Sequence, residues 1–176
     1  MAAMSRKQTA TPEAKRAHAQ ANSLYETDYY SWALAQARAL RKRRPDQLDW
    51  MNLAEEVEDL ANRNADALES QTERLIAHLL KIAVAPSRIR QENLRIWELS
   101  MRDAKRKIRT LLKRNPGLKH RANDVFREAW LGGRDQALAA TGLPDEAIAE
   151  NSPWTFQQII EEEFMPGTLP GATRQV

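Results

Sequence analysis

The fold is decided by residues 49–114, DWMNLAEEVEDLANRNADALESQTERLIAHLLKIAVAPSRIRQENLRIWELSMRDAKRKIRTLLKR. This stretch contains no glycine, and its single proline is Pro86. On both sides of Pro86, apolar residues recur at three- and four-residue steps, which is the spacing of one face of an α-helix. We therefore expect two long helices that meet at residues 85–87.

The first of these helices is expected to begin after Asp49, whose side chain would cap it, and to end at Ala85. Two polar residues, Asn64 and Thr72, interrupt its apolar stripe. The stretch is therefore either one long bent helix or two helices broken near residues 62–64. The absence of glycine and proline favours one helix. The apolar stripe consists of Leu53, Val57, Leu60, Leu68, Leu75, Leu79 and Ile82.

The second helix is expected to begin at Ser87 as its cap and to end at the turn 115–117. Its apolar residues step by three and four in alternation, as in a coiled-coil seam. The short link at residues 86–87 forces the two helices to reverse direction or cross, and short connections favour antiparallel neighbours. The seam is Leu94, Trp97, Met101, Ala104, Ile108 and Leu111. The residues expected to be buried against each other are Trp97, Met101 and Ile108 on this side and Val57, Leu68 and Leu75 on the other.

Flanking segments also have helical signals. We expect a helix capped by Thr27 that ends at Pro45, a helix over about residues 118–140, and a short helix opened by Ser152. Gly132 and Gly133 in the middle of the second of these predict either a kink or a close backbone contact. The fold class is therefore all-α, a helical bundle built on a long antiparallel helix hairpin with flanking helices. We expect residues 1–24 to be flexible, residues 25–165 to form a single helical domain, and residues 166–176 to be a disordered tail.

The composition limits the class of protein. The 176 residues include no cysteine, which excludes a disulfide scaffold and any thiolate nucleophile or thiolate metal site. The N-terminus has no apolar signal region, and the longest apolar stretch, residues 75–85, is too short to span a bilayer. These features favour a cytoplasmic location and no association with a membrane.

The charge is unevenly distributed, although the net charge is only +3. Residues 49–73 hold eight acidic residues and one basic residue, and residues 81–121 hold thirteen basic and three acidic residues. One interpretation is that Lys105 to Arg114 lie beside Glu55 to Asp59 in the hairpin, so that opposite charges flank the seam. The other is a nucleic-acid-binding face on the second helix. The residues of that face are Arg102, Lys105, Arg106, Arg109 and Lys113.

One group of residues suggests a metal site at first sight, namely Glu55, Glu56, Glu58, Asp59 and His78. Helical di-metal sites use a Glu-x-x-His spacing, and this chain lacks it. We expect the acidic residues to form a solvated face and His78 to be a partly buried histidine with its hydrogen bonds satisfied. No catalytic constellation is visible in the sequence. We therefore expect no cofactor and no metal, and the interpretation as an enzyme is disfavoured.

Five short segments, in this order, resemble the bacterial family catalogued as domain of unknown function number twenty-nine. The resemblance covers residues 25–166 and implies a small helical protein without an assigned activity. The segments are YETDYYSW at 25–32, NLAEEVEDL at 52–60, HLLK at 78–81, NPGL at 115–118 and PWTFQQI at 153–159.

The sequence thus leaves three classes of function open. The first is a helical interaction module that works through a protein partner or self-association. The second is a nucleic-acid-binding accessory protein that uses the basic second helix, and the third is a metal-dependent enzyme.

Overall fold

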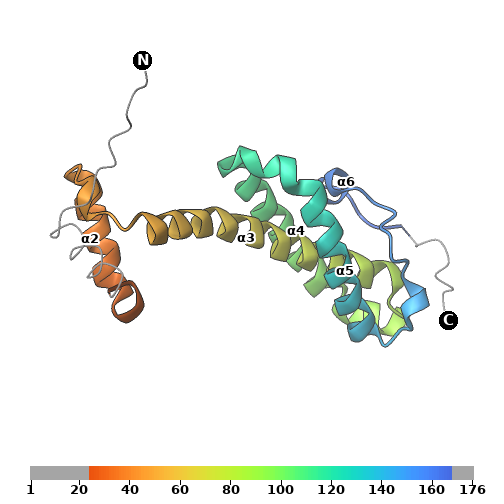
Figure 1. The fold of residues 1–176 in the computed structure, drawn as a ribbon. Coiled ribbons are helices and arrows are strands. Elements are labelled where there is room, and N and C mark those ends of the chain that lie inside the picture. The colour runs from red at the N-terminus through yellow and green to blue at the C-terminus, as the bar shows by residue number, and fades with distance from the viewer. Residues whose placement is uncertain (1–23, 168–176) are drawn as a thin grey trace, which may run out of the picture. The chain divides into compact units, whose positions relative to one another are not determined.

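The computed structural model describes residues 24–167, and within them it contains helices and no strands. The all-α prediction is therefore confirmed (Figure 1). The chain divides into two compact units, residues 1–61 and 62–176. Residues 1–23 and 168–176 lie outside the described residues. The predictions of a flexible segment at 1–24 and a disordered tail at 166–176 fall almost entirely on them.

The first unit contains α2 (Tyr29–Arg41), the short 3-10 helix η1 (Pro45–Gln47) and the beginning of α3. The cap of α2 is Asp28, whose carboxylate accepts a hydrogen bond from the Ser31 backbone N–H at 3.1 Å. The prediction that Thr27 is the cap is therefore wrong by one residue. A carboxylate at this position also faces the positive end of the helix dipole, which a threonine hydroxyl does not exploit.

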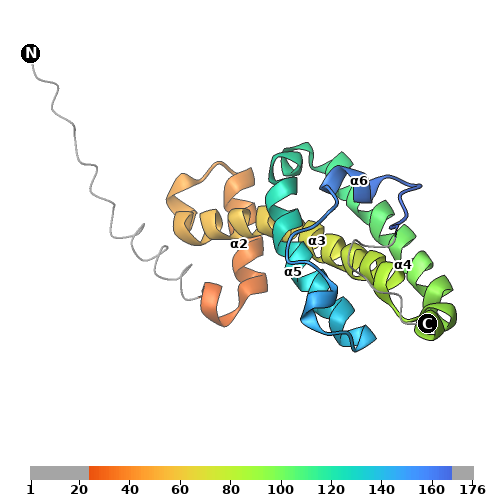
Figure 2. The same cartoon turned by 90° about the vertical axis from the view of Figure 1, so that its right-hand side faces the viewer.

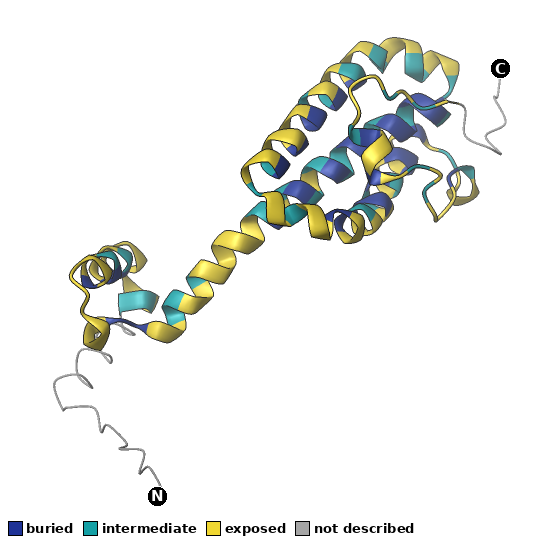
Figure 3. Cartoon of the chain, turned by 90° about the horizontal axis from the view of Figure 1, so that it is seen from above, coloured by how far each residue is buried: buried dark blue, intermediate teal, exposed yellow. Residues whose placement is uncertain are grey.

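Helix α3 (Trp50–Val84) is one continuous helix of 35 residues, which confirms the prediction of a single long helix. Asp49 caps it as expected, since its Oδ1 lies 3.5 Å from the Asn52 backbone nitrogen. The apolar stripe, however, is buried only from Ala65 onward. Residues 57–63 are all exposed, as Figure 3 shows, and Val57 is 62% exposed. The prediction that Val57 packs against the seam of the second helix is therefore wrong.

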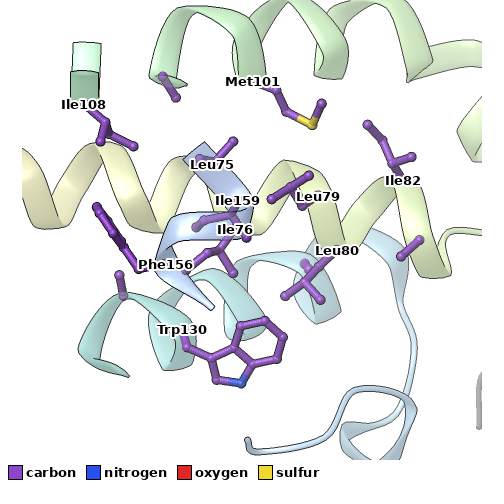
Figure 4. Packing of buried hydrophobic residues seen from close by; sticks show 14 of the residues in the cluster. Leu75, Ile76, Leu79, Leu80, Ile82, Met101, Ile108, Trp130, Phe156 and Ile159 are labelled. Carbon is purple, nitrogen blue, oxygen red and sulfur yellow. The ribbon is translucent and has the colours of Figure 1, made fainter. Parts of the chain in front are cut away.

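Helix α4 (Ser87–Arg114) begins directly after Pro86 and runs back along α3, so the expected hairpin is present. Ser87 is its first helical residue and makes no capping hydrogen bond, so the predicted cap is wrong. The Arg74 Nε atom donates to Ser100 Oγ at 2.9 Å across the hairpin. Trp97, Met101 and Ile108 are buried, as predicted, and Figure 4 shows Met101 and Ile108 facing Leu75 and Leu79 of α3.

Helix α5 (Ala122–Thr141) follows the 3-10 helix η2 (Pro116–Arg121) and packs on α3 (Figures 1 and 2). It begins four residues later than predicted, because residues 116–121 form the tighter 3-10 turn. A Cβ atom on Gly133 would lie 2.8 Å from Ile76 Cγ2 and 3.0 Å from the Glu73 carbonyl oxygen. Of the two predicted alternatives, the close backbone contact is therefore the correct one. Gly142 ends the helix with a φ of 68°.

The last described helix is α6 (Phe156–Ile160), which lies beside α4 and α5 (Figure 2) and follows the 3-10 helix η3 (Asp145–Ala147). It is capped by Thr155 in a capping box with Gln158, and not by Ser152 as predicted. The Ser152 hydroxyl instead accepts from the Trp154 backbone N–H at 3.0 Å. Phe156 and Ile159 are buried and complete the core of the second unit.

Candidate functional site

A cationic groove lies on α4 in the second unit. Arg102, Arg106, Arg109 and Lys113 recur at four-, three- and four-residue steps, so they share one face of the helix, and all four are exposed. Together with Lys105, Thr110 and Glu162, they line a cavity of about 480 Å³. The structure thus brings together all five residues of the face that the sequence suggested.

Lys105 plays a different part from the other four cations, because it is buried. Its Nζ donates to the carbonyl oxygens of Glu161 at 2.6 Å, Glu162 at 3.3 Å and Phe164 at 2.8 Å. Burial lowers the pKa of Lys105, and the nearby Arg109 lowers it further. Lys105 therefore lines the groove from below the segment 161–164 and is not part of the exposed row of cations. Its ammonium group holds the segment 161–164 against α4, and this segment forms one wall of the groove.

Glu162 is the one carboxylate among the residues that line the groove. Its Oε2 lies 3.1 Å from Arg109 Nη1, and its side chain is 82% exposed. Arg106 pairs with Asp103 at 2.6 Å. Among the described residues, Arg102 and Lys113 form no ion pair. The groove therefore keeps a net positive charge, and two of its cations are available to an incoming anion.

A second group of charges on α4 is centred on Asp103. The Asp103 carboxylate lies 2.9 Å from Lys107 Nζ, 2.6 Å from Arg106 Nη2 and 3.6 Å from Arg74 Nη1. Hydrogen bonds from Lys107 and Arg106 lower the pKa of Asp103. Residues 55–59 belong to the first unit. Within the second unit, the acidic partners of the α4 cations are Asp103 and Glu162, and the predicted matching of Lys105 to Arg114 with Glu55 to Asp59 stays a prediction.

An aromatic cluster in the first unit engages Glu56, one of the residues considered as a metal ligand. The hydroxyl groups of Tyr25 and Tyr29 donate to its two carboxylate oxygens at 3.0 and 2.5 Å. The hydrogen bond to Glu56 is the main cause that raises the pKa of Tyr25 to about 12. The ring of Trp32 lies 4.8 Å from that of Tyr25. The i, i+4, i+7 spacing of these aromatics was the available signal in the sequence.

Asp49 is a second polar centre in the first unit, and it is buried. Its Oδ2 accepts from Asn52 Nδ2 at 2.7 Å and from Trp32 Nε1 at 3.3 Å. Its backbone N–H donates to Gln36 Oε1 at 2.8 Å. Trp32 and Asn52 both belong to the segments that carry the family resemblance. Their role here is structural, because they hold α2 to the start of α3.

His78 is partly buried, as expected, but its hydrogen bonds are not all satisfied. Its Nδ1 lies buried without a hydrogen-bond partner among the described residues. Burial is the largest cause that lowers the pKa of His78, to about 4, and the charges of Lys81 and Arg74 add to it. Within residues 24–167, no group of three or more histidine, aspartate or glutamate residues could hold a metal ion. His78 is therefore a neutral side chain of the hairpin.

Acid is expected to destabilise the fold through His78. The folded state does not protonate His78 until about pH 4, whereas an unfolded chain protonates it near its ordinary value of 6.5. Between these values the unfolded state binds more protons, so stability falls as the pH is lowered from about 6.5 to about 4. Urea denaturation at pH 7 and pH 5 should show a smaller loss of stability for His78→Gln than for the unmodified chain. The matched control is His120→Gln at an exposed position, and an equal loss in all three proteins would contradict the assignment.

One of three comparisons with known proteins found a match. No helix in the described part of the chain is long and apolar enough to cross a membrane. No curated protein and no solved structure matches this chain. The model of a family described as "Domain of unknown function DUF29" matches residues 24–165, which include parts of both compact units. The resemblance seen in the sequence is therefore confirmed, and the chain belongs to the DUF29 family.

Proposed function

We propose that the chain is a helical interaction module that associates with a second copy of itself through its first unit. One observation carries this proposal. Of the twelve large apolar side chains that are exposed in the described residues, eight lie between Tyr29 and Leu60. A concentration of exposed apolar side chains of this kind is typical of a protein–protein interaction surface.

The exposed part of α3 supports association with another helix. Val57 and Leu60 are three residues apart, so they are neighbours on the helix surface, and they are 62% and 57% exposed. Residues 57–63 are exposed on every side of the helix. Burial of Val57 and Leu60 against another helix would therefore stabilise this part of α3.

The charges of the first unit favour a second copy over an unrelated partner. The end of α2 and the following loop hold five basic residues within residues 38–44, and the start of α3 holds four acidic residues within residues 55–59. A two-fold interface uses the same surface on both copies, so the surface must be complementary to itself. A surface that carries both a basic and an acidic cluster meets this requirement.

The test is the oligomeric state of the full chain. Sedimentation equilibrium over a wide range of concentrations should show a reversible monomer–dimer equilibrium. The double variant Val57→Gln, Leu60→Gln should shift the dissociation constant at least tenfold toward the monomer. The matched control is Ile96→Gln, Leu99→Gln, which changes two side chains of the second unit with the same spacing and nearly the same exposure, 63% and 56%. Glutamine is a good helix former, so neither pair should unfold its helix.

Two results would contradict this proposal. A chain that stays monomeric at every concentration would exclude self-association and leave a different protein as the partner. Equal dissociation of both double variants would place the interface outside the first unit.

Nucleic-acid binding is the second candidate function, and the cationic groove favours it. Arg102, Arg106, Arg109 and Lys113 form a row of exposed positive charges on one face of α4. Such a row attracts phosphates in a strongly salt-dependent manner. A lack of any binding to single-stranded oligonucleotides at low salt would exclude this candidate.

A further inference from the structure

We infer that the cationic groove is a binding site for a linear chain of linked phosphates, recognised through its phosphate groups alone. The site lies in the second unit, so this inference is independent of association through the first. The groove lies between α4 and the segment 161–164, which is 47 or more residues away from α4 in the sequence. Its volume of about 480 Å³ falls within the range of ligand-binding sites, roughly 300–1,000 Å³.

The net positive charge of the groove lining favours an anionic ligand. Three arginines and two lysines line it, against the single carboxylate of Glu162. Arginine binds phosphate oxygens through two parallel hydrogen bonds, which makes it the preferred residue for such groups. Arg102 and Lys113 lie at the two ends of the row. Among the described residues they form no ion pair, so a ligand would not have to break one. The groove is therefore open to phosphates at both ends.

The length of the row selects an extended ligand. Arg102 and Lys113 are eleven positions apart, which corresponds to roughly 16 Å along an α-helix. A single phosphate can reach only two neighbouring cations of the row, those one helical turn apart. A ligand that contacts the whole row must carry several phosphates in a line.

The side chains of the groove set a plain phosphate chain apart from a nucleic-acid strand. Proteins that bind single strands stack the bases on aromatic side chains, and base edges are read largely by arginine, asparagine and glutamine. Among the residues that line the described groove, there is no aromatic residue, asparagine or glutamine. The arginines are aligned in one row that suits the phosphates. The groove therefore offers contacts to phosphates and no platform for bases.

The Glu162 carboxylate competes with the ligand for Arg109. This carboxylate occupies Arg109 at 3.1 Å, where a phosphate would bind. The side chain is 82% exposed and can turn into solvent without disturbing the core. The backbone of the same residue stays in place, because its carbonyl and those of Glu161 and Phe164 accept hydrogen bonds from Lys105. Removal of the Glu162 charge should therefore strengthen binding, an effect that structural damage would not produce.

The experiment measures binding of a fluorescently labelled linear polyphosphate of about ten phosphates to the full chain by anisotropy at low salt. The double variant Arg102→Gln, Lys113→Gln should weaken binding at least tenfold. Its control, Arg95→Gln, Arg114→Gln, removes the same net charge from exposed positions of α4 outside the groove and should change the affinity less than threefold. Glu162→Gln should tighten binding about threefold or more, while Glu163→Gln, at an exposed neighbour outside the groove, should not.

Three ligands and the matched variants decide the outcome. Orthophosphate at millimolar concentration should not compete with the polyphosphate, since it cannot span the row. If the groove double variant and the control double variant weakened polyphosphate binding equally, net charge alone would explain the binding and the inference would be overturned. A single-stranded oligonucleotide with the same number of phosphates that binds more tightly than the polyphosphate would overturn it in favour of nucleic acid. An absence of polyphosphate binding at low salt, or no gain with Glu162→Gln, would overturn it as well.

Discussion

Replacing Trp97 by alanine is expected to lower the free energy of unfolding by about 3–5 kcal/mol. Trp97 belongs to the core between α3 and α4 and is only 8% exposed. Alanine would remove the whole indole from this core and leave a cavity that the two long helices cannot close without moving. The loss is a large share of the roughly 5–15 kcal/mol that stabilises a typical domain. Urea denaturation followed by far-ultraviolet circular dichroism measures it.

Two neighbours of Trp97 on the same helix provide the control. Ile96 and Leu99 are 63% and 56% exposed, so their replacement by alanine should cost less than about 0.5 kcal/mol each. If Trp97→Ala also shifted the unfolding free energy by well under 1 kcal/mol, the seam of α4 would not be part of this chain's core.

The hairpin could be predicted because its signals are local. The steps of three and four residues in α4 depend only on helix geometry, and Trp97, Met101 and Ile108 are buried as that pattern requires. The same pattern failed at Val57, because periodicity marks an apolar face without saying what covers it. Helix α3 is continuous over 35 residues, yet its stripe is buried only from Ala65 onward. The position along a helix at which an apolar stripe stops being buried depends on tertiary packing, which the local sequence pattern does not contain.

The candidate site could be predicted in part, for a similar reason. The common face of the four exposed cations follows from their spacing on one helix. The burial of Lys105 does not, because its carbonyl partners at residues 161–164 lie 56–59 residues away in the chain. A lysine can bury its apolar stem while its ammonium group reaches hydrogen-bond acceptors. Which residues come close enough to accept those bonds depends on how α6 packs beside α4, and no local pattern contains that information.

The contact between α3 and α5 gives the second large expected effect. Gly133→Ala is expected to lower the free energy of unfolding, because overpacking a core usually costs about 1–3 kcal/mol. The new Cβ would lie 2.9 Å from Ile76 Cβ and 3.0 Å from the Glu73 carbonyl oxygen. Both atoms are fixed by the helix α3 itself, so α5 would have to move away. Alanine gains roughly 1 kcal/mol over glycine within a helix, so the expected net loss of stability is up to about 2 kcal/mol.

Gly132→Ala is the matched control, because it makes the same chemical change one residue earlier. Its Cβ would lie 2.7 Å from Glu73 Cδ and Oε1, which are the far end of a flexible side chain. That carboxylate can turn aside at the cost of its hydrogen bond with Gln136 Nε2. We therefore expect Gly132→Ala to be neutral or to stabilise the chain by up to about 1 kcal/mol, the helix-propensity gain. Chemical denaturation of the two variants side by side is the measurement. Equal changes in both would mean that α5 does not approach the backbone of α3 at Gly133, and a stabilised Gly133→Ala would exclude the close contact altogether.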